Sequence, residues 1–333
     1  MKVILHSLFS GRSLERAEAR RSMDLAMSGE LAPEQVAAFL GALRAKKETV
    51  EELVGFALSM RAHGVPVPCK RTDLMDSCGT GGDGSGTFNI STAAALVLAG
   101  AGVGVAKHGN RSVSSRCGSA DVLEALGVKC DLSPERVAQS IDSLGFGFLF
   151  APQFHPLLKN LAGVRRALGV PTVLNLLGPV VNPAKVKRQV VGIYDPSLLE
   201  NYARLLLELG SEEVMVVCAE NGLDEISLSG ATRIAHLKEG KIKMLSIKPE
   251  DAGLPEASLE SLRGGDAREN AATIEAILKG VKGPKRDVVL INAAAGFWVA
   301  GRCTTFREGV QRAAQAIDSG AAFGLLAQLL SFS

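Results

Sequence analysis

The sequence predicts an α/β fold in two parts, a small N-terminal helical domain and a larger α/β domain with a mostly parallel central sheet. Three observations lead to this prediction. The chain has 333 residues, and at roughly 150 residues a domain this length favours two domains. Residues 1–70 show helical periodicity. Beyond them, short apolar runs rich in β-branched residues alternate with helical segments, which is typical of a parallel sheet covered on both faces.

Helices account for the N-terminal domain, which is expected at residues 1–70. The first extends over 14–27 after Ser13 as its N-cap, and the next begins near Pro33. A third opens with Thr49-Val50-Glu51-Glu52, the pattern of a capping box. Apolar residues in the second and third helices recur at the spacing of one buried helix face. The stretch Gly64-Val65-Pro66-Val67-Pro68 then interrupts the pattern and predicts a linker.

The larger domain, expected at 71–333, is predicted from alternating strands and helices. The expected strands are 73–77, 103–106, 190–194, 213–218, 242–247 and 287–292. The expected helices between them are 90–99, 120–126, 196–209 and 269–278. Ligands of such sheets bind at the carboxyl ends of the strands, so polar residues that directly follow a strand are candidate site residues.

The composition excludes several classes of protein. Hydrophobic residues make up 47% and charged residues 22%, which excludes a disordered chain. The 37 basic and 35 acidic residues nearly cancel and aromatic residues are only 5%, so we expect no nucleic-acid partner. The longest apolar run, 92–106, is shorter than the roughly 18 residues of a membrane span, so we expect no membrane partner. The 6 scattered cysteines predict reduced thiols in a cytoplasmic protein.

The densest glycine cluster is Asp76-Ser77-Cys78-Gly79-Thr80-Gly81-Gly82-Asp83-Gly84-Ser85-Gly86, between an expected strand and an expected helix. Glycines let backbone N–H groups approach phosphate oxygens, and the helix N-terminus adds partial positive charge. Three of the glycines fit G-x-G-x-x-G, but the next strand ends in Lys107-His108 instead of the acid of a dinucleotide site. No Gly-Lys-Ser/Thr closes the stretch as in a P-loop. The cluster therefore predicts another kind of phosphate-binding loop.

A second polar stretch is Lys107-His108-Gly109-Asn110-Arg111-Ser112-Val113-Ser114-Ser115. Cations, an imidazole, an amide and hydroxyls so close together suit a polyanion such as pyrophosphate. Alone, the stretch is also compatible with a solvated polar loop, and its place one strand–helix unit after the glycine cluster favours the anion site. Gly118-Ser119-Ala120-Asp121 then begins a helix, with Ser119 as its N-cap or as a hydroxyl donor to phosphate.

These stretches resemble the anthranilate phosphoribosyltransferase family of tryptophan biosynthesis. The resemblance covers essentially the whole chain, because it continues in Phe154-His155-Pro156, Val164-Arg165-Arg166, Asn175-Leu176-Leu177-Gly178-Pro179 and Gly222-Leu223-Asp224-Glu225-Ile226. It implies a fold of the nucleoside phosphorylase/phosphoribosyltransferase type, in which residues of about 160–180 return to the helical domain. It also implies a homodimer formed through that domain.

The resemblance implies transfer of the phosphoribosyl group of 5-phosphoribosyl 1-pyrophosphate (PRPP) to the amine of anthranilate. The products are N-(5′-phosphoribosyl)-anthranilate and pyrophosphate. A leaving pyrophosphate needs Mg²⁺ and oriented donors, whereas an oxocarbenium-like ribose needs no protein nucleophile. A nucleoside phosphorylase of the same fold and a non-catalytic phosphoribosyl-binding paralogue are the alternatives. The first gives Asn110 and Arg165 no purpose, and the second predicts losses in the phosphate loops that the sequence does not have.

The resemblance also implies the site residues. Lys107, Asn110 and Arg165 are the expected catalytic residues, and a planar guanidinium suits the carboxylate of anthranilate. Ser91, Asp224 and Glu225 are the expected Mg²⁺ ligands, since this cation prefers oxygen. The expected substrate-binding residues are Gly79, Gly82, Asp83, Thr87, Asn89, Ser91, Thr92, Lys107, His108, Gly109, Asn110, Arg111, Ser112, Val113, Ser114, Ser115, Ser119 and Arg165.

Three positions depart from the family's pattern. Gly163 stands where proline is expected, Pro171 where arginine is frequent, and Leu174 where phenylalanine is expected. All three are near the expected anthranilate tunnel or hinge, so they bear on substrate fit and domain closure. The sequence leaves open the extent of closure and any association with an anthranilate synthase component.

Overall fold

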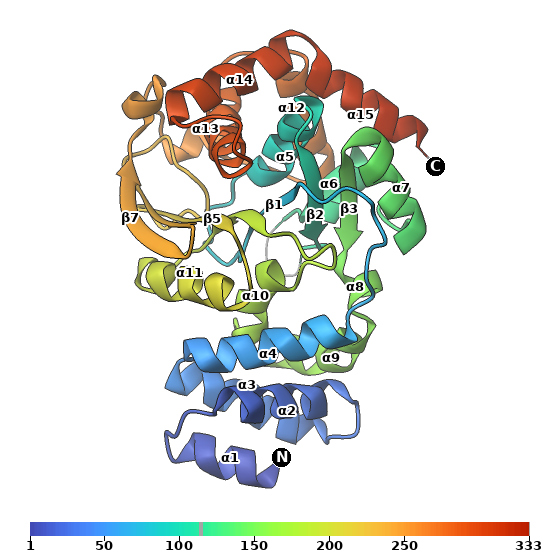
Figure 1. Ribbon diagram of the computed structural model, residues 1–333, viewed down its shortest axis with the longest axis vertical. Coiled ribbons are helices and arrows are strands. Elements are labelled where there is room, and N and C mark those ends of the chain that lie inside the picture. The colour runs from blue at the N-terminus through green and yellow to red at the C-terminus, as the bar shows by residue number, and fades with distance from the viewer. Residues whose placement is uncertain (113–115, 333) are drawn as a thin grey trace.

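The computed structural model describes residues 1–112 and 116–332, so Val113, Ser114 and Ser115 lie outside the described part. Figure 1 shows helices gathered at the N-terminal end of the molecule and a sheet covered by further helices at the other end. The expected α/β class with a small helical part is confirmed. Among the described residues, no helix combines the length and apolar character needed to cross a bilayer.

The three helices expected in the N-terminal part are present close to where their sequence patterns predict, whereas the first helix, α1, was not predicted. Thr49 starts its helix with the expected capping box, since its hydroxyl accepts a hydrogen bond from the Glu52 backbone. The helix expected at 14–27 begins later than expected. The buried Glu52 carboxylate accepts the backbone N–H of Leu14 and holds that residue outside the helix. These helices are α1 (Lys2–Phe9), α2 (Arg16–Met27), α3 (Pro33–Lys46) and α4 (Val50–His63).

In the described residues the sheet has seven strands in the order β3-β2-β1-β4-β5-β6-β7. Neighbours from β3 to β5 pair in parallel, and β5, β6 and β7 pair antiparallel, so the sheet is mostly parallel as predicted. The strand order reverses at β1, where open α/β sheets bind ligands. The strands are β1 (Leu74–Gly79), β2 (Gly104–Gly109), β3 (Phe146–Phe150), β4 (Arg188–Gly192), β5 (Glu213–Ala219), β6 (Thr232–Lys238) and β7 (Lys241–Ile247).

Alternate strand residues enter cores on opposite faces of the sheet. Val190 packs with α5, α6 and α12–α15, while Val191 packs with α11 and the N-terminal helices. Near β1–β3 this second face is covered by α7 and α8. Burial on both faces explains why the strands are continuous apolar runs. The covering helices are α5 (Ile90–Gly100), α6 (Ser119–Ala125), α7 (Pro134–Leu144), α8 (Ala151–Phe154), α11 (Leu199–Glu208), α12 (Ala267–Leu278), α13 (Pro284–Val299), α14 (Phe306–Asp318) and α15 (Ala321–Ser331).

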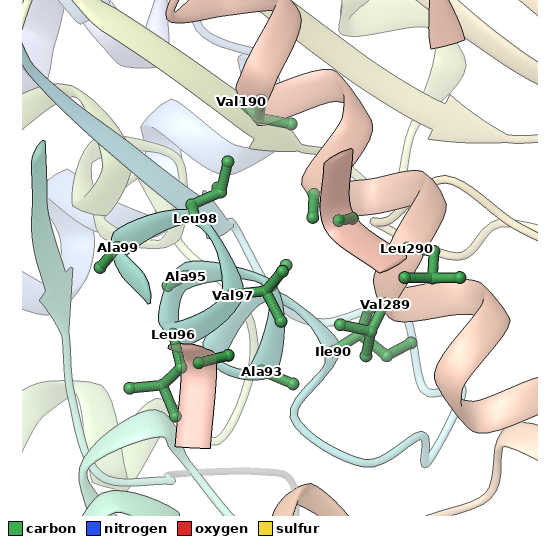
Figure 2. Packing of buried hydrophobic residues seen from close by; sticks show 14 of the residues in the cluster. Ile90, Ala93, Ala95, Leu96, Val97, Leu98, Ala99, Val190, Val289 and Leu290 are labelled. Carbon is green, nitrogen blue, oxygen red and sulfur yellow. The ribbon is translucent and has the colours of Figure 1, made fainter. Parts of the chain in front are cut away.

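The strand expected at 287–292 is wrong, because these residues lie within α13. This helix is buried between the sheet, α5 and α14. Figure 2 shows Val289 and Leu290 of α13 beside Ile90 of α5, in the core that also contains Val190 of β4. A helix buried on all sides has an unbroken apolar run, which periodicity does not distinguish from a buried strand.

After β3 the chain leaves the sheet and forms α8, α9 (Lys159–Leu168) and α10 (Val173–Leu177). α9 contacts α2 and α3, and α10 contacts α3 and α4. Figure 1 shows the arrowheads of β2 and β3 directed toward this helical half of the molecule. The residues that follow β2 therefore lie at the edge of the sheet nearest the helical half.

Candidate active site

The loop between β1 and α5 has a conformation that requires glycine. Gly81, Gly82, Gly84 and Gly86 have φ between 65° and 86°, the left-handed region that other residues rarely adopt. The end of the loop is fixed to the chain before α12, since the Gly264 N–H donates to the Gly86 carbonyl at 2.9 Å. The loop thus exposes backbone N–H groups in front of the N-terminus of α5, where an anion is favoured.

The acidic turn Asp224-Glu225 packs directly against this loop. The Gly81 N–H donates to Asp224 Oδ2 at 2.8 Å, and the Ser91 N–H at the start of α5 donates to Glu225 Oε1 at 3.1 Å. Glycine is needed beneath the turn, because a Cβ at Gly192 would lie 1.5 Å from the Asp224 carbonyl oxygen. β4 and α5 therefore fix the turn from two sides.

Burial shifts the acidity of this turn. It raises the pKa of Asp224, and the nearby charge of Asp83 raises it further. Burial also raises the pKa of Glu225, and the charge of Asp224 adds to that effect. Three carboxyl groups close together would be stabilised as anions by a bound cation.

The donor set fits Mg²⁺. The carboxylates of Asp224 and Glu225 and the hydroxyl of Ser91 are hard oxygen donors close to the phosphate loop. Among the described residues no group of three His, Cys, Asp or Glu side chains has the geometry of a metal site. Mg²⁺ usually takes several of its ligands from water and substrate phosphates, so two carboxylates and a hydroxyl suffice as the protein's contribution.

Lys107 and Asp76 are buried side chains of opposite charge beneath the loops. Lys107 is 1% exposed, and its ammonium donates to the Ser77 carbonyl. Asp76 is fully buried and accepts hydrogen bonds from Asn182 Nδ2 at 2.8 Å and from the His108 N–H at 3.3 Å. Burial raises the pKa of Asp76, and the charge of Lys107 opposes that shift. The pair thus places a cation at the end of β2 inside the fold.

His108 is a neutral imidazole in this structure. Its Nδ1 lies 3.1 Å from the Gly178 carbonyl oxygen, which can only accept, so Nδ1 carries the proton. Burial, together with the nearby His155, lowers the pKa of His108 to about 3. Its Nε2 is buried and has no hydrogen-bond partner among the described residues. His108 thus stays uncharged near neutral pH, with Nδ1 as a hydrogen-bond donor and Nε2 as an acceptor.

The chain after β2 folds back onto α6. Ser119 is the first residue of α6 and not its N-cap, and its hydroxyl donates to the Asn110 carbonyl at 3.3 Å. Gly109 is required there, because a Cβ would lie 2.2 Å from Ser119 Oγ. Arg111 points to α6, where its guanidinium pairs with Glu124 at 2.6 Å. A phosphate contact by Arg111 therefore requires it to leave Glu124.

The remaining expected residues have different surroundings. Asn89 donates to the Cys117 carbonyl at 3.1 Å, and Thr92 is buried in the first turn of α5. Thr87 pairs with Arg263 in an isolated antiparallel bridge. Gly82 faces the ring of Tyr194, and the Ser112 N–H donates to Asp121 Oδ2 at 2.9 Å.

Arg165 is separate from the phosphate loops. It lies on α9, half-buried against the helical half, and in the described part of the chain its guanidinium has no hydrogen bond or ion pair. Burial lowers the pKa of Arg165, although an arginine stays charged near neutral pH. An unpaired, half-buried guanidinium is a place where an anionic group would be stabilised.

Three buried asparagines that lie outside the sequence motifs hold the site together. Asn182 joins the Asp76 carboxylate to the Ala106 carbonyl, Asn270 donates to Asn89 Oδ1 at 3.0 Å, and Asn292 binds the backbone of Ile226. Each is at most 3% exposed. The signal that could have identified Asn292 is a single amide inside a long apolar run.

Known proteins resemble this chain over its full length. Residues 2–64 match the glycosyl transferase family, helical bundle domain, and residues 71–323 match its a/b domain. An anthranilate phosphoribosyltransferase of Moorella thermoacetica is 51% identical over 100% of this chain and 98% of its own length. The crystal structure of the enzyme of that name from Thermus thermophilus has a TM-score of 0.92 and 44% identity, and covers 99% of this chain and 98% of its own. The Saccharomyces cerevisiae enzyme in complex with PRPP and Mg has a TM-score of 0.92 and 29% identity, with 99% and 96% coverage.

Proposed function

This chain belongs to the anthranilate phosphoribosyltransferase family, and we propose which of its residues carry out the family's reaction. The protein transfers the phosphoribosyl group of PRPP to the amine of anthranilate, releasing pyrophosphate, in tryptophan biosynthesis. One observation supports the residue assignment above all others. The glycine-rich loop, the N-terminus of α5 and the acidic turn meet at the carboxyl end of β1.

PRPP is held by backbone and side-chain donors at the ends of β1 and β2. The left-handed glycines expose N–H groups for its phosphates, and the start of α5 adds the partial positive charge of a helix N-terminus. Lys107 stabilises the leaving pyrophosphate, since its ammonium has spare donors beyond the Ser77 carbonyl. The assigned PRPP residues are Gly79, Gly82, Asp83, Thr87, Asn89, Ser91, Thr92, Lys107, Gly109, Arg111, Ser112 and Ser119.

Asp224, Glu225 and Ser91 would hold the Mg²⁺ that accompanies PRPP. The bound cation would neutralise charge that accumulates on pyrophosphate as it leaves. Each carboxylate is already oriented by a backbone N–H, from Gly81 or from Ser91. The Mg-containing complex of the Saccharomyces cerevisiae relative supports this cofactor.

Anthranilate is bound by Arg165, Asn110 and His108. The unpaired guanidinium of Arg165 complements the carboxylate of anthranilate. The backbone carbonyl of Asn110 accepts a hydrogen bond from Ser119 on α6, and its Oδ1 accepts one from the Arg111 N–H. The side-chain NH₂ group of Asn110 therefore remains available as a donor. His108 offers Nε2 as an acceptor once the surrounding side chains make room for the substrate.

The chemistry requires orientation and charge stabilisation more than proton transfer. Anthranilate is an aromatic amine that is already neutral near pH 7, so no strong base is needed to free its lone pair. A pKa of about 3 for His108 agrees with that requirement, because such an imidazole is too weak a base to take up a second proton near pH 7. The helical half next to the carboxyl ends of β2 and β3 would keep water away from the oxocarbenium-like ribose.

The reaction can be followed by the loss of anthranilate fluorescence. Purified protein is mixed with PRPP, Mg²⁺ and anthranilate, and each component is omitted in turn. We expect fluorescence loss only when all three are present. No fluorescence loss in the complete mixture, together with release of free base from a nucleoside and phosphate, would contradict the assignment.

We also propose that two copies associate through the helical half in the cytoplasm. Val3 and Phe9 on α1 are 78% and 68% exposed, which is unusual for large apolar side chains. Replacing both by aspartate should convert the species seen by light scattering from a dimer to a monomer. An unchanged dimer mass in that variant would exclude α1 from the interface.

A further inference from the structure

Asn292 is a polar side chain in the middle of the buried helix α13. It is 1% exposed, and its neighbours Ile291 and Ala293 are fully buried apolar residues. A buried amide is destabilising unless its donors and acceptor are paired. The side-chain amide of Asn292 is paired at both ends: Oδ1 accepts from the Ile226 N–H, and Nδ2 donates to the carbonyls of Ile226 and Val288, each at 2.9 Å.

Two of these three hydrogen bonds go to one residue on a distant segment. The side-chain amide of Asn292 binds both the N–H and the carbonyl of Ile226, as a neighbouring strand would. Ile226 lies outside the strands of the sheet, so its backbone groups are not paired in a sheet ladder. Asn292 therefore fixes a stretch of backbone that secondary structure does not hold.

Ile226 directly follows the acidic turn. The turn is held on its other sides by the Gly81 N–H on Asp224, by the Ser91 N–H on Glu225, and by Gly192 beneath the Asp224 carbonyl. Those three contacts belong to the phosphate loop, α5 and β4. Asn292 adds an anchor from α13 at the carboxyl end of the turn.

We propose that Asn292 is a positioning residue for the magnesium–PRPP site, because its two hydrogen bonds to the Ile226 backbone set the direction of the Asp224 and Glu225 carboxylates. The inference rests on the proposed role of these carboxylates. Asn292 itself touches neither substrate nor metal in this arrangement. Its loss changes the affinity for PRPP with Mg²⁺ and leaves the anthranilate site, which is built from β2 and α9, unchanged.

The test compares Asn292→Leu with Ile291→Ala. Leucine has nearly the shape of asparagine but makes no hydrogen bond, whereas Ile291→Ala disturbs the same helix and leaves the hydrogen bonds between Asn292 and Ile226 in place. Calorimetric titration of PRPP in the presence of Mg²⁺ should give a Kd raised about tenfold in Asn292→Leu. The Mg²⁺ concentration for half-maximal turnover should rise in parallel, while KM for anthranilate stays within about twofold. Ile291→Ala should lower the Tm and leave both PRPP measurements at their original values.

Asn292→Asp serves if the leucine variant does not fold. Aspartate keeps the acceptor for the Ile226 N–H but loses the amide donors, so its PRPP affinity should fall between those of the original protein and the leucine variant. A folded Asn292→Leu or Asn292→Asp protein with unchanged PRPP affinity overturns the inference. Asp224→Asn with Glu225→Gln separates the two proposals. If this double variant keeps the original Mg²⁺ dependence, the metal role assigned to the two carboxylates is wrong. If the double variant loses that dependence but the Asn292 variants keep the original PRPP affinity, only the positioning role of Asn292 is wrong.

Discussion

Asp76 and Lys107 bring opposite charges into the interior next to the substrate loops. Charged side chains are rarely buried unless they are paired, because transfer from water is costly. Here Asn182 and the His108 N–H satisfy the Asp76 carboxylate, while Ser77 is the one described acceptor of the Lys107 ammonium. Lys107 thus keeps donor capacity for an anion while its charge is balanced inside the fold.

Arg165 should control the affinity for anthranilate. Arg165→Ala removes an unpaired guanidinium that complements a carboxylate, and a charge-assisted hydrogen bond contributes about 1.5–3 kcal/mol. KM for anthranilate should therefore rise roughly 10–100-fold in steady-state kinetics, with KM for PRPP nearly constant. Arg166→Ala is the matched control, because Arg166 is the exposed neighbour on the same helix. Equal effects on both substrates would contradict the assignment.

The acidic turn should make the stability of the metal-free protein dependent on pH. The pKa values of Asp224 and Glu225 are raised, so the folded state favours their protonated forms. The stability that this contributes is present below the usual carboxyl range and is lost as the pH rises through the raised pKa values.

Asp224→Asn with Glu225→Gln removes that titration. Its Tm, measured by calorimetry without Mg²⁺, should match the original protein at pH 4 and exceed it by roughly 3 °C at pH 8.5. A Tm difference that stays constant across this range would show that the two carboxyls titrate normally.

At the scale of elements, the sequence pattern predicts where helices and strands lie better than it distinguishes them when both are buried. The capping box at Thr49 and the glycine loop before α5 follow from local chemistry, so both could be predicted. Residues 287–292 of α13 have the pattern of a strand, because burial on all sides removes helical periodicity. β3 and β6 are not predicted from the sequence, because each forms a strand only by pairing with another part of the chain. β3 pairs in parallel with β2, and β6 pairs antiparallel with β5.

The candidate site follows the same division. Residues in dense local motifs, such as Lys107 and the Asp224-Glu225 turn, could be found from the sequence. Asn182, Asn270 and Asn292 could not, because each acts through a hydrogen bond to a segment far away in the chain. Arg111 is in a local motif, but the motif does not indicate that its guanidinium forms an ion pair with Glu124 on α6.

The start of α4 depends on one buried carboxylate. Glu52 is fully buried and accepts hydrogen bonds from Lys46 Nζ, the Leu14 N–H and the Thr49 N–H. Glu52→Ala would remove the carboxylate that balances the Lys46 ammonium and would leave two backbone donors without partners, so we expect a loss of about 3–5 kcal/mol in denaturant unfolding. Glu51→Ala is the control, because Glu51 makes an exposed ion pair with Arg16 that is worth at most about 1 kcal/mol. Similar losses in both variants would contradict this ranking.

At the scale of the whole molecule, the helical half is attached to the α/β half through α4 and α11. Arg61 of α4 donates to the Val180 carbonyl at 2.8 Å and to the Leu209 carbonyl at 3.0 Å. Leu209 ends α11, which packs on the sheet, and Val180 lies in the turn after α10 that contacts both α4 and β2. No carboxylate balances Arg61 in the described residues, and burial lowers its pKa. The guanidinium therefore joins the halves by backbone contacts alone.

Arg61→Leu should weaken the attachment of the two halves while keeping each half folded. Two hydrogen bonds from a charged donor are lost, and the buried carbonyls of Val180 and Leu209 are left unpaired, a cost of about 3–5 kcal/mol. The linker after α4 should become more susceptible to limited proteolysis, and the calorimetric transition should move to lower temperature and broaden. Arg21→Leu on the exposed surface of α2 should change neither measurement. If Arg61→Leu lowers the Tm but the linker stays resistant to protease, the halves unfold together, and Arg61 stabilises the fold without acting as the joint between them.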